Sequence, residues 1–99
     1  MTTDQTVDTI RARLRAMLPE LRQRYPIASL GLFGSWVRGE QRPDSDLDVL
    51  VEFDGPIGWR IVTLEDELSA RLGVKVDLVP RRGLRPRIGE RILAEVVPV

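Results

Sequence analysis

The sequence contains no cysteine and no histidine. Without thiols and imidazoles, the chain has no disulfide, no zinc site of the common kinds, no thiol nucleophile and no imidazole base. Any catalysis must therefore rest on carboxylates, hydroxyls, cationic side chains or a hard metal ion.

Long apolar segments and a net charge are absent as well. No apolar run approaches the roughly 18 residues of a transmembrane helix, and residues 1–5 lack the basic and then apolar stretch of a signal peptide. Fifteen basic and fifteen acidic side chains leave no formal net charge, which gives no general attraction to nucleic acids or anionic lipids. We therefore expect a cytoplasmic protein that contacts neither a membrane nor, directly, a nucleic acid.

What the sequence does contain fits one small globular domain. Its 99 residues, 42% hydrophobic and 30% charged, suffice for one core and one site, although such a chain buries only about two-thirds of its unfolded surface. The charges are unevenly spread, since residues 11–24 and 81–91 are rich in arginine and residues 40–67 hold nine acidic side chains against Arg42 and Arg60. An acidic centre thus lies between two basic ends.

The first segment has helical periodicity. Apolar residues recur at steps of three and four between residues 4 and 24, which predicts an amphipathic helix with Thr3 or Asp4 as its N-cap. Pro19 lies inside this pattern and should bend or divide the helix, because proline lacks the backbone N–H and clashes with the preceding turn.

Two predicted strands follow, separated by a turn and a loop. Residues 27–33 form a short apolar run typical of a buried strand. Gly34-Ser35 begins a turn into a short helical piece that Gly39 ends. Residues 46–53 alternate, so that their side chains divide between two faces of a strand: Leu47, Val49, Val51 and Phe53 on one, and Asp46, Asp48, Leu50 and Glu52 on the other.

The last part of the chain predicts helix, strand and helix. A second amphipathic helix should end near Leu72 at Gly73, a third strand should cover residues 74–79, and Pro86 can open a last helix. The apolar stripe of the second helix is expected to consist of Ile61, Val62, Leu64, Leu68 and Leu72. The order indicates an α/β (α+β) fold, a layer of three or so strands covered by helices.

One constellation combines groups suited to phosphate and metal binding. Gly34-Ser35 lies where a strand turns into a helix, and ten residues later Asp46-Leu47-Asp48 places two carboxylates on one strand face. Free backbone N–H groups and a hydroxyl at such a turn can hold phosphate oxygens, and paired carboxylates can hold Mg²⁺. Taken singly these features, and Asp77 on the third strand, are ordinary. Together, three crowded carboxylates would repel one another, and a divalent cation would relieve that repulsion.

These residues carry a family resemblance. The run from Gly34 to Val51, GSWVRGEQRPDSDLDVLV, followed by Val76-Asp77-Leu78-Val79, resembles the minimal nucleotidyltransferase (MNT) group of the DNA polymerase beta-type nucleotidyltransferases. The resemblance extends over about residues 26–99. It implies a single domain over residues 1–99, with an N-terminal helix over 1–25 and a catalytic core over 26–99. The implied fold is a small mixed sheet of three to four strands with helices packed on one face.

The resemblance also implies a reaction and its residues. Two Mg²⁺ ions would be held by Asp46, Asp48 and Asp77, while Gly34 and Ser35 would steady the phosphates of ATP. An acceptor hydroxyl would attack the α-phosphate, pyrophosphate would leave, and Asp77 would act as base or orient the nucleophile. Arg38, four residues after Gly34, could reach the phosphates.

Members of this group resemble antitoxins of HEPN-domain ribonuclease toxins, some of which they inactivate by moving AMP from ATP onto a tyrosine. A chain of this size has no second domain to hold a bulky acceptor, so a HEPN partner in a hetero-oligomer would supply it. The first helix offers a candidate docking surface through the arginines at positions 11, 15, 22 and 24.

Three other interpretations remain open at this point. The same fold could serve as a non-catalytic antitoxin that neutralises its partner by contact, and alanine at Asp46 and Asp48 would separate the two. Glycosyltransferases and aspartyl-phosphate phosphatases also use Asp-x-Asp, but they usually need larger chains and do not explain Gly34-Ser35. Nucleic-acid binding through the arginine-rich ends would lack a net positive charge and a reading motif. Trp36 is expected to pack against a helix or a partner rather than on a base, and Lys75 to pair with an acid or to act on a phosphate.

Overall fold

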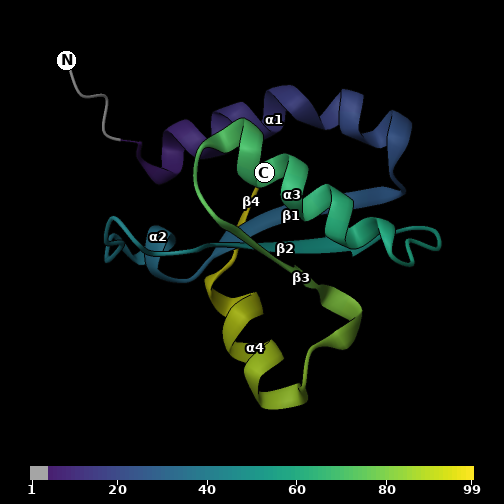
Figure 1. The fold of residues 1–99 in the computed structure, drawn as a ribbon. Coiled ribbons are helices and arrows are strands. Elements are labelled where there is room, and N and C mark those ends of the chain that lie inside the picture. Colours follow the sequence, from purple (N-terminus) through teal and green to yellow (C-terminus); the bar gives the residue numbers. More distant parts are fainter. Residues whose placement is uncertain (1–4) are drawn as a thin grey trace.

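Four strands form one mixed sheet at the centre of the protein (Figure 1). The structure is a computed structural model that describes residues 5–99. The strands are β1 (Ile27–Phe33), β2 (Leu47–Phe53), β3 (Val76–Pro80) and β4 (Val97–Pro98). Their order in the sheet is β3-β2-β1-β4; β2 pairs parallel with β3, whereas β1 runs antiparallel to both β2 and β4. The predicted mixed sheet of three to four strands is confirmed.

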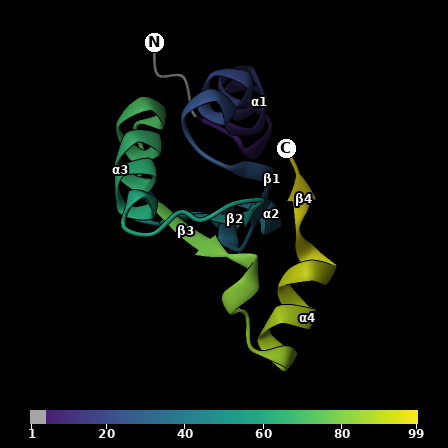
Figure 2. The ribbon, with the colours of Figure 1, turned by 90° about the vertical axis from the view of Figure 1, so that its right-hand side faces the viewer.

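Two long helices cover one face of this sheet. Helix α1 (Val7–Arg24) and helix α3 (Arg60–Leu72) lie on the same side, as both views show (Figures 1 and 2). Their buried stripes meet the apolar side chains of the strands in one core, formed by Ile10, Leu14, Met17, Leu21, Leu30, Leu32, Leu47, Val49, Val51, Leu64, Leu68, Leu72, Val76 and Leu78 among others. Val62, expected in the stripe of α3, is 49% exposed, so the stripe is narrower than predicted.

Helix α1 is a single helix despite its proline. Of the two effects expected at Pro19, a bend or a division, the division is wrong, because the helix runs through Pro19; the turns on both sides of Pro19 are anchored in the core by Met17 and Leu21. The side chain of Thr6 caps the helix by accepting a hydrogen bond from the Thr9 N–H. The predicted caps, residues 3 and 4, lie outside the described residues.

The four α1 arginines predicted as a candidate docking surface also make contacts within the chain. Arg11 and Arg15 donate to the carbonyls of Pro98 and Val99, at 2.6 and 3.0 Å. Arg22 donates to the carbonyl of Ala28 at 2.9 Å, and Arg24 pairs with a carboxylate of α3. These side chains therefore tie α1 to the C-terminal strand, β1 and α3.

The other face of the sheet is partly covered by the C-terminal segment. A short 3-10 turn (η1, Arg81–Gly83) leads into α4 (Pro86–Glu95), which lies on the side of the sheet away from α1 and α3 (Figure 2). Phe33 and Leu50 are buried but lie outside the main core cluster. Leu50 was expected on a polar strand face, and its burial shows that this face is apolar at its centre. Within residues 5–99, no helix is long and apolar enough to span a membrane.

Candidate active site

The turn after β1 has a backbone conformation that requires glycine. Gly34 has φ 83° and ψ −155° and is followed by α2 (Ser35–Arg38), which ends at the left-handed Gly39. The Gly34 carbonyl accepts the N–H groups of Val37 and Arg38, which closes the turn. A Cβ built on Gly34 would lie 2.0 Å from Oδ2 of Asp48. The turn and a carboxylate of β2 are thus in close contact, as their joint role in a phosphate and metal site would require.

The three predicted carboxylates come from two neighbouring strands. Asp48 on β2 is the register partner of Asp77 on β3, and partners on parallel strands point to the same face of a sheet. Asp46 lies just before β2, with its side chain 42% exposed and 4.0 Å from the Lys75 ammonium. The expected pairing of Lys75 with an acid is therefore confirmed, with Asp46 as its partner.

The surroundings of Asp48 disfavour its ionised form. Burial raises its pKa, the neighbouring charges of Asp77 and Asp46 raise it further, and the Arg38 guanidinium partly opposes the shift. A nearby cation would stabilise the ionised form of a carboxylate that two other carboxylates repel. The donor set therefore has the chemistry of a hard-metal site.

The side chains do not enclose a cation in this conformation. Over residues 5–99 no three acidic side chains converge into a group that could hold a metal ion by themselves. Mg²⁺ commonly takes one or two carboxylates and completes its shell with substrate phosphates and water. The arrangement is consistent with metal binding that depends on a phosphorylated substrate.

A narrow cleft lies beside Asp48 and the Gly34 turn. Its volume is about 320 Å³, and it opens between the sheet and α4. One wall carries Phe33, Gly34, Arg38 and Asp48, and the other carries Ile88, Arg91, Ile92 and Glu95. Neither Asp46 nor Asp77 is a lining residue of this cleft. Trp36, as expected, packs in the core rather than at the site.

Comparison with known proteins assigns the fold and the family. The nucleotidyltransferase domain family matches residues 14–99. The chain belongs to this family. A protein adenylyltransferase of Thermococcus cleftensis, MntA, is 43% identical over 95 residues, which are 95% of this chain and 96% of the relative. The resemblance drawn from the motif residues is confirmed, and the protein is a nucleotidyltransferase.

Solved structures agree with this family. A structure described as a minimal nucleotidyltransferase is 41% identical, with a TM-score of 0.81, and covers 99% of this chain and 100% of that one. The MNT antitoxin fold also occurs in a complex with a tri-AMPylated HEPN toxin from Shewanella oneidensis; that match has a TM-score of 0.66 at 20% identity and covers 90% of this chain and 70% of that one. The second match supports the fold alone.

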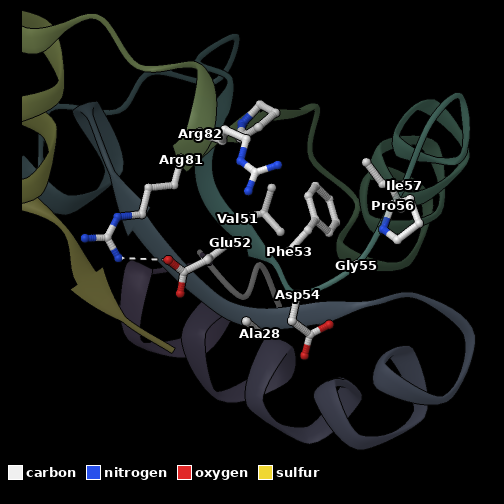
Figure 3. Close-up of a pocket in the computed structure, with 11 residues that line it drawn as sticks. Ala28, Val51, Glu52, Phe53, Asp54, Gly55, Pro56, Ile57, Arg81 and Arg82 are labelled. Carbon is white, nitrogen blue, oxygen red and sulfur yellow. Dashed lines mark hydrogen bonds and ion pairs between the residues drawn. The ribbon is translucent and has the colours of Figure 1, made fainter.

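A larger cavity of this nucleotidyltransferase lies away from the motif. It measures about 970 Å³ and is formed by the ends of β2 and β3 and the loop after β2 (Figure 3). Its lining carries two acidic and two basic side chains, Glu52, Asp54, Arg81 and Arg82, and the Arg81 guanidinium is directed at the Glu52 carboxylate at 3.1 Å (Figure 3). The smaller cleft beside Asp48 is therefore the better candidate for chemistry.

One residue of the site was missed by the sequence analysis. Glu95, in the last turn of α4, accepts a hydrogen bond from the Gly34 N–H at 2.9 Å and pairs with Arg38 at 2.6 Å. Arg38, predicted to reach phosphates, is thus held between Glu95 and Glu40. Glu95 is 61 residues from Gly34 in the chain, and no local pattern could connect the two.

Proposed function

We propose that this nucleotidyltransferase transfers AMP from ATP to a protein hydroxyl and thereby acts as an antitoxin. The observation that carries the proposal is the contact of the Gly34 turn with Asp48, whose register partner is Asp77. The named activity of a relative with 43% identity over nearly the whole chain supports the substrate class.

We propose the following roles for the site residues. Gly34 and Ser35 would hold phosphate oxygens through backbone N–H groups and the Ser35 hydroxyl. Arg38 lines the same cleft, and its planar guanidinium suits phosphate oxygens. Asp46, Asp48 and Asp77 would hold two Mg²⁺ ions together with the triphosphate, since the charges of Asp46 and Asp77 disfavour the ionised form of Asp48 and a cation would relieve that repulsion. When bound, Mg²⁺ supplies charge neutralisation and makes an acceptor hydroxyl more acidic.

The transfer itself is an in-line displacement at the α-phosphorus. The acceptor oxygen forms a bond to the α-phosphorus while the bond to the oxygen bridging to the β-phosphate breaks. Pyrophosphate leaves with that oxygen, and the hydroxyl proton passes to a carboxylate, for which we propose Asp77. Its exposed position on β3 leaves room for an acceptor to approach. Catalysis then consists of positioning and of balancing charge.

The acceptor belongs to a partner in this proposal. We propose a tyrosine of a HEPN ribonuclease toxin, held in a hetero-oligomer with this chain. An MNT antitoxin with a fold related to that of this chain forms a complex with a tri-AMPylated HEPN toxin, which supports this choice of partner class.

The test is label transfer from ATP. ATP labelled on the α-phosphate, with Mg²⁺, is incubated with the protein and a HEPN-domain protein encoded next to it, and ATP labelled on the γ-phosphate is the control. AMP transfer predicts a labelled partner with the α-label only. The Asp46→Ala/Asp48→Ala variant should label nothing while keeping its circular dichroism spectrum.

Two results would contradict the proposal. Transfer of the γ-label would indicate phosphorylation instead of AMP transfer. No label from either form, with the partner bound and silenced equally by both, would show that the fold acts as an antitoxin by contact alone. A tyrosine-to-phenylalanine partner variant that is still labelled would move the acceptor to another residue.

A further inference from the structure

The carboxylate of Glu95 occupies a position suited to a phosphate oxygen. One oxygen, Oε2, accepts the Gly34 N–H at 2.9 Å, and the other, Oε1, lies 2.6 Å from an Arg38 nitrogen. These are two of the groups to which phosphate binding is assigned above. An intramolecular anion is therefore bound where the anionic substrate would have to bind.

The contact is charged and partly shielded. The Gly34 N–H and the Arg38 guanidinium hold the pKa of Glu95 below its usual range, and its side chain is 25% exposed. Arg91, one turn earlier on α4, faces the same cleft and adds positive charge near Glu95. Charge-assisted hydrogen bonds of this kind are stronger than neutral ones, so a competing ligand has to overcome a substantial interaction.

The position of Glu95 allows it to leave. It is in the last turn of α4, and within residues 86–95 only Gly89 is buried. The other side chains of α4 are exposed or half-buried, but β4 begins two residues after Glu95 and pairs with β1, so this end of the helix is anchored. Glu95 therefore leaves by a change of its own side-chain rotamer, which opens the anion position without moving the sheet.

We infer that Glu95 is a built-in competitor of the triphosphate: it occupies the anion position between Gly34 and Arg38 in the nucleotide-free protein and is displaced when ATP binds. This inference rests on the proposed function, because it takes the Gly34 turn and Arg38 as phosphate-binding groups. The apparent affinity for nucleotide is the intrinsic affinity multiplied by the fraction of molecules in which Glu95 has left the anion position. Glu95 thereby sets the ATP concentration at which the protein becomes active.

The test compares two glutamates of α4. Glu95→Gln removes the charge at the cleft with little change in shape, and Glu90→Gln removes the same charge from an exposed position of the same helix that does not line the cleft. Isothermal titration calorimetry measures binding of inorganic tripolyphosphate and of ATP with Mg²⁺ to the wild type and both variants. Tripolyphosphate isolates the phosphate contacts from those of the base and ribose.

The expected result is binding about three- to tenfold tighter in Glu95→Gln than in the wild type, with Glu90→Gln unchanged. The amide resonance of Gly34 should also shift when tripolyphosphate is added to the wild type, and in Glu95→Gln without any ligand. Circular dichroism checks that both variants are folded. In label transfer, Glu95→Gln should lower the KM for ATP, whereas Glu90→Gln should keep the wild-type KM.

Weaker or equal binding by Glu95→Gln would overturn the inference and make Glu95 a positioning residue that holds Gly34 and Arg38 ready for phosphate. Equal tightening in Glu90→Gln would overturn it too, because the effect would then come from net charge. If AMP transfer proceeds normally in the wild type, either outcome leaves the proposed function standing. If no form binds a triphosphate, both proposals fail together.

Discussion

At the scale of single residues, the candidate site depends on how closely a backbone and a carboxylate approach each other. Gly34 combines a positive φ with an extended ψ, a region open almost only to glycine, and its missing Cβ leaves space for Asp48. Gly39 also has a positive φ, but a Cβ there would meet nothing within 4 Å. A side chain at Gly39 would therefore cost backbone strain alone, whereas a side chain at Gly34 would cost backbone strain and a steric clash.

Alanine substitutions at both glycines make this difference measurable. Gly39→Ala should lower the free energy of unfolding by about 1 kcal/mol, the cost of a left-handed alanine. Gly34→Ala should lower it by more than about 2 kcal/mol, because strain and the clash with Asp48 add. Urea denaturation of both variants provides the comparison; equal losses would show that the Asp48 carboxylate moves away without cost.

Asp48 is expected to lower the stability of the folded protein while being required for AMP transfer. Its ionised form is disfavoured in the folded state by burial and by Asp77 and Asp46, so Asp48→Asn should raise the free energy of unfolding near neutral pH by about 1 kcal/mol or less. AMP transfer should fall at least about 100-fold in the same variant.

The sign of the pH dependence follows from the raised pKa of Asp48. In the wild type the charge penalty is present above the raised pKa and disappears as the pH falls below the ordinary range of aspartate. The stability advantage of Asp48→Asn should therefore vanish near about pH 3. Thermal denaturation across this pH range tests it, and an advantage that persists in acid would point to a packing effect instead of charge.

At the scale of elements, charged contacts join the helices that cover the sheet. Glu67 on α3 accepts hydrogen bonds from Arg24 at the end of α1, from the Tyr25 hydroxyl and from Arg71. Arg71 also binds Glu20 of α1 at 2.8 Å. Because one carboxylate receives donors from both helices, this network fixes how the ends of α1 and α3 meet.

Removing the charge of Glu67 should weaken this junction. The hydrogen bonds from Arg24 are the main reason that the pKa of Glu67 is lowered, so its contribution to stability is present above the ordinary pKa of glutamate and is lost as the pH falls through the lowered value. Glu67→Gln should cost about 1 kcal/mol near neutral pH and nothing in strong acid. Asp66→Asn, on the same helix, is the control. Chemical denaturation near neutral pH and in strong acid should give this variant nearly the same free energy of unfolding as the wild type.

At the scale of the whole molecule, the site joins segments that are distant in the chain. The Gly34 turn, Asp48 of β2 and α4 meet at one cleft, and only the folded sheet brings them together. A ligand that binds this cleft binds the folded state alone and must therefore stabilise the entire protein.

Nucleotide binding should be visible as thermal stabilisation. ATP with Mg²⁺ at about 100 times its Kd should add about 2.7 kcal/mol, which corresponds to a rise in Tm of about 10 °C or more for a domain of this size. Mg²⁺ alone should produce a much smaller rise, because the carboxylates do not enclose a cation by themselves. A variant with asparagine at both Asp46 and Asp48 should lose most of the ATP effect; an undiminished rise would place the nucleotide elsewhere.

Local patterns determined much of the fold and the family. The helical period and the strand alternation predicted α1, β1, β2 and α3 to within a few residues, because side-chain spacing follows directly from backbone geometry. The spacing of Gly34-Ser35 and Asp46-Leu47-Asp48 indicated only a phosphate and metal site; the nucleotidyltransferase family was indicated by the resemblance of the run from Gly34 to Val51, together with Asp77, to that family. The two-residue strand β4 had no such period to show it.

Only the tertiary structure decided which side chains share the site and which lie apart. The partners of Arg38 and of the α1 arginines could not be predicted, because ion pairs between distant elements depend on the packing of whole helices. Leu50 became buried and Val62 exposed for the same reason: the width of an apolar face is set by what covers it. Glu95 reaches Gly34 because α4 packs against the face of the sheet away from α1 and α3. No short segment of the sequence predicts this packing.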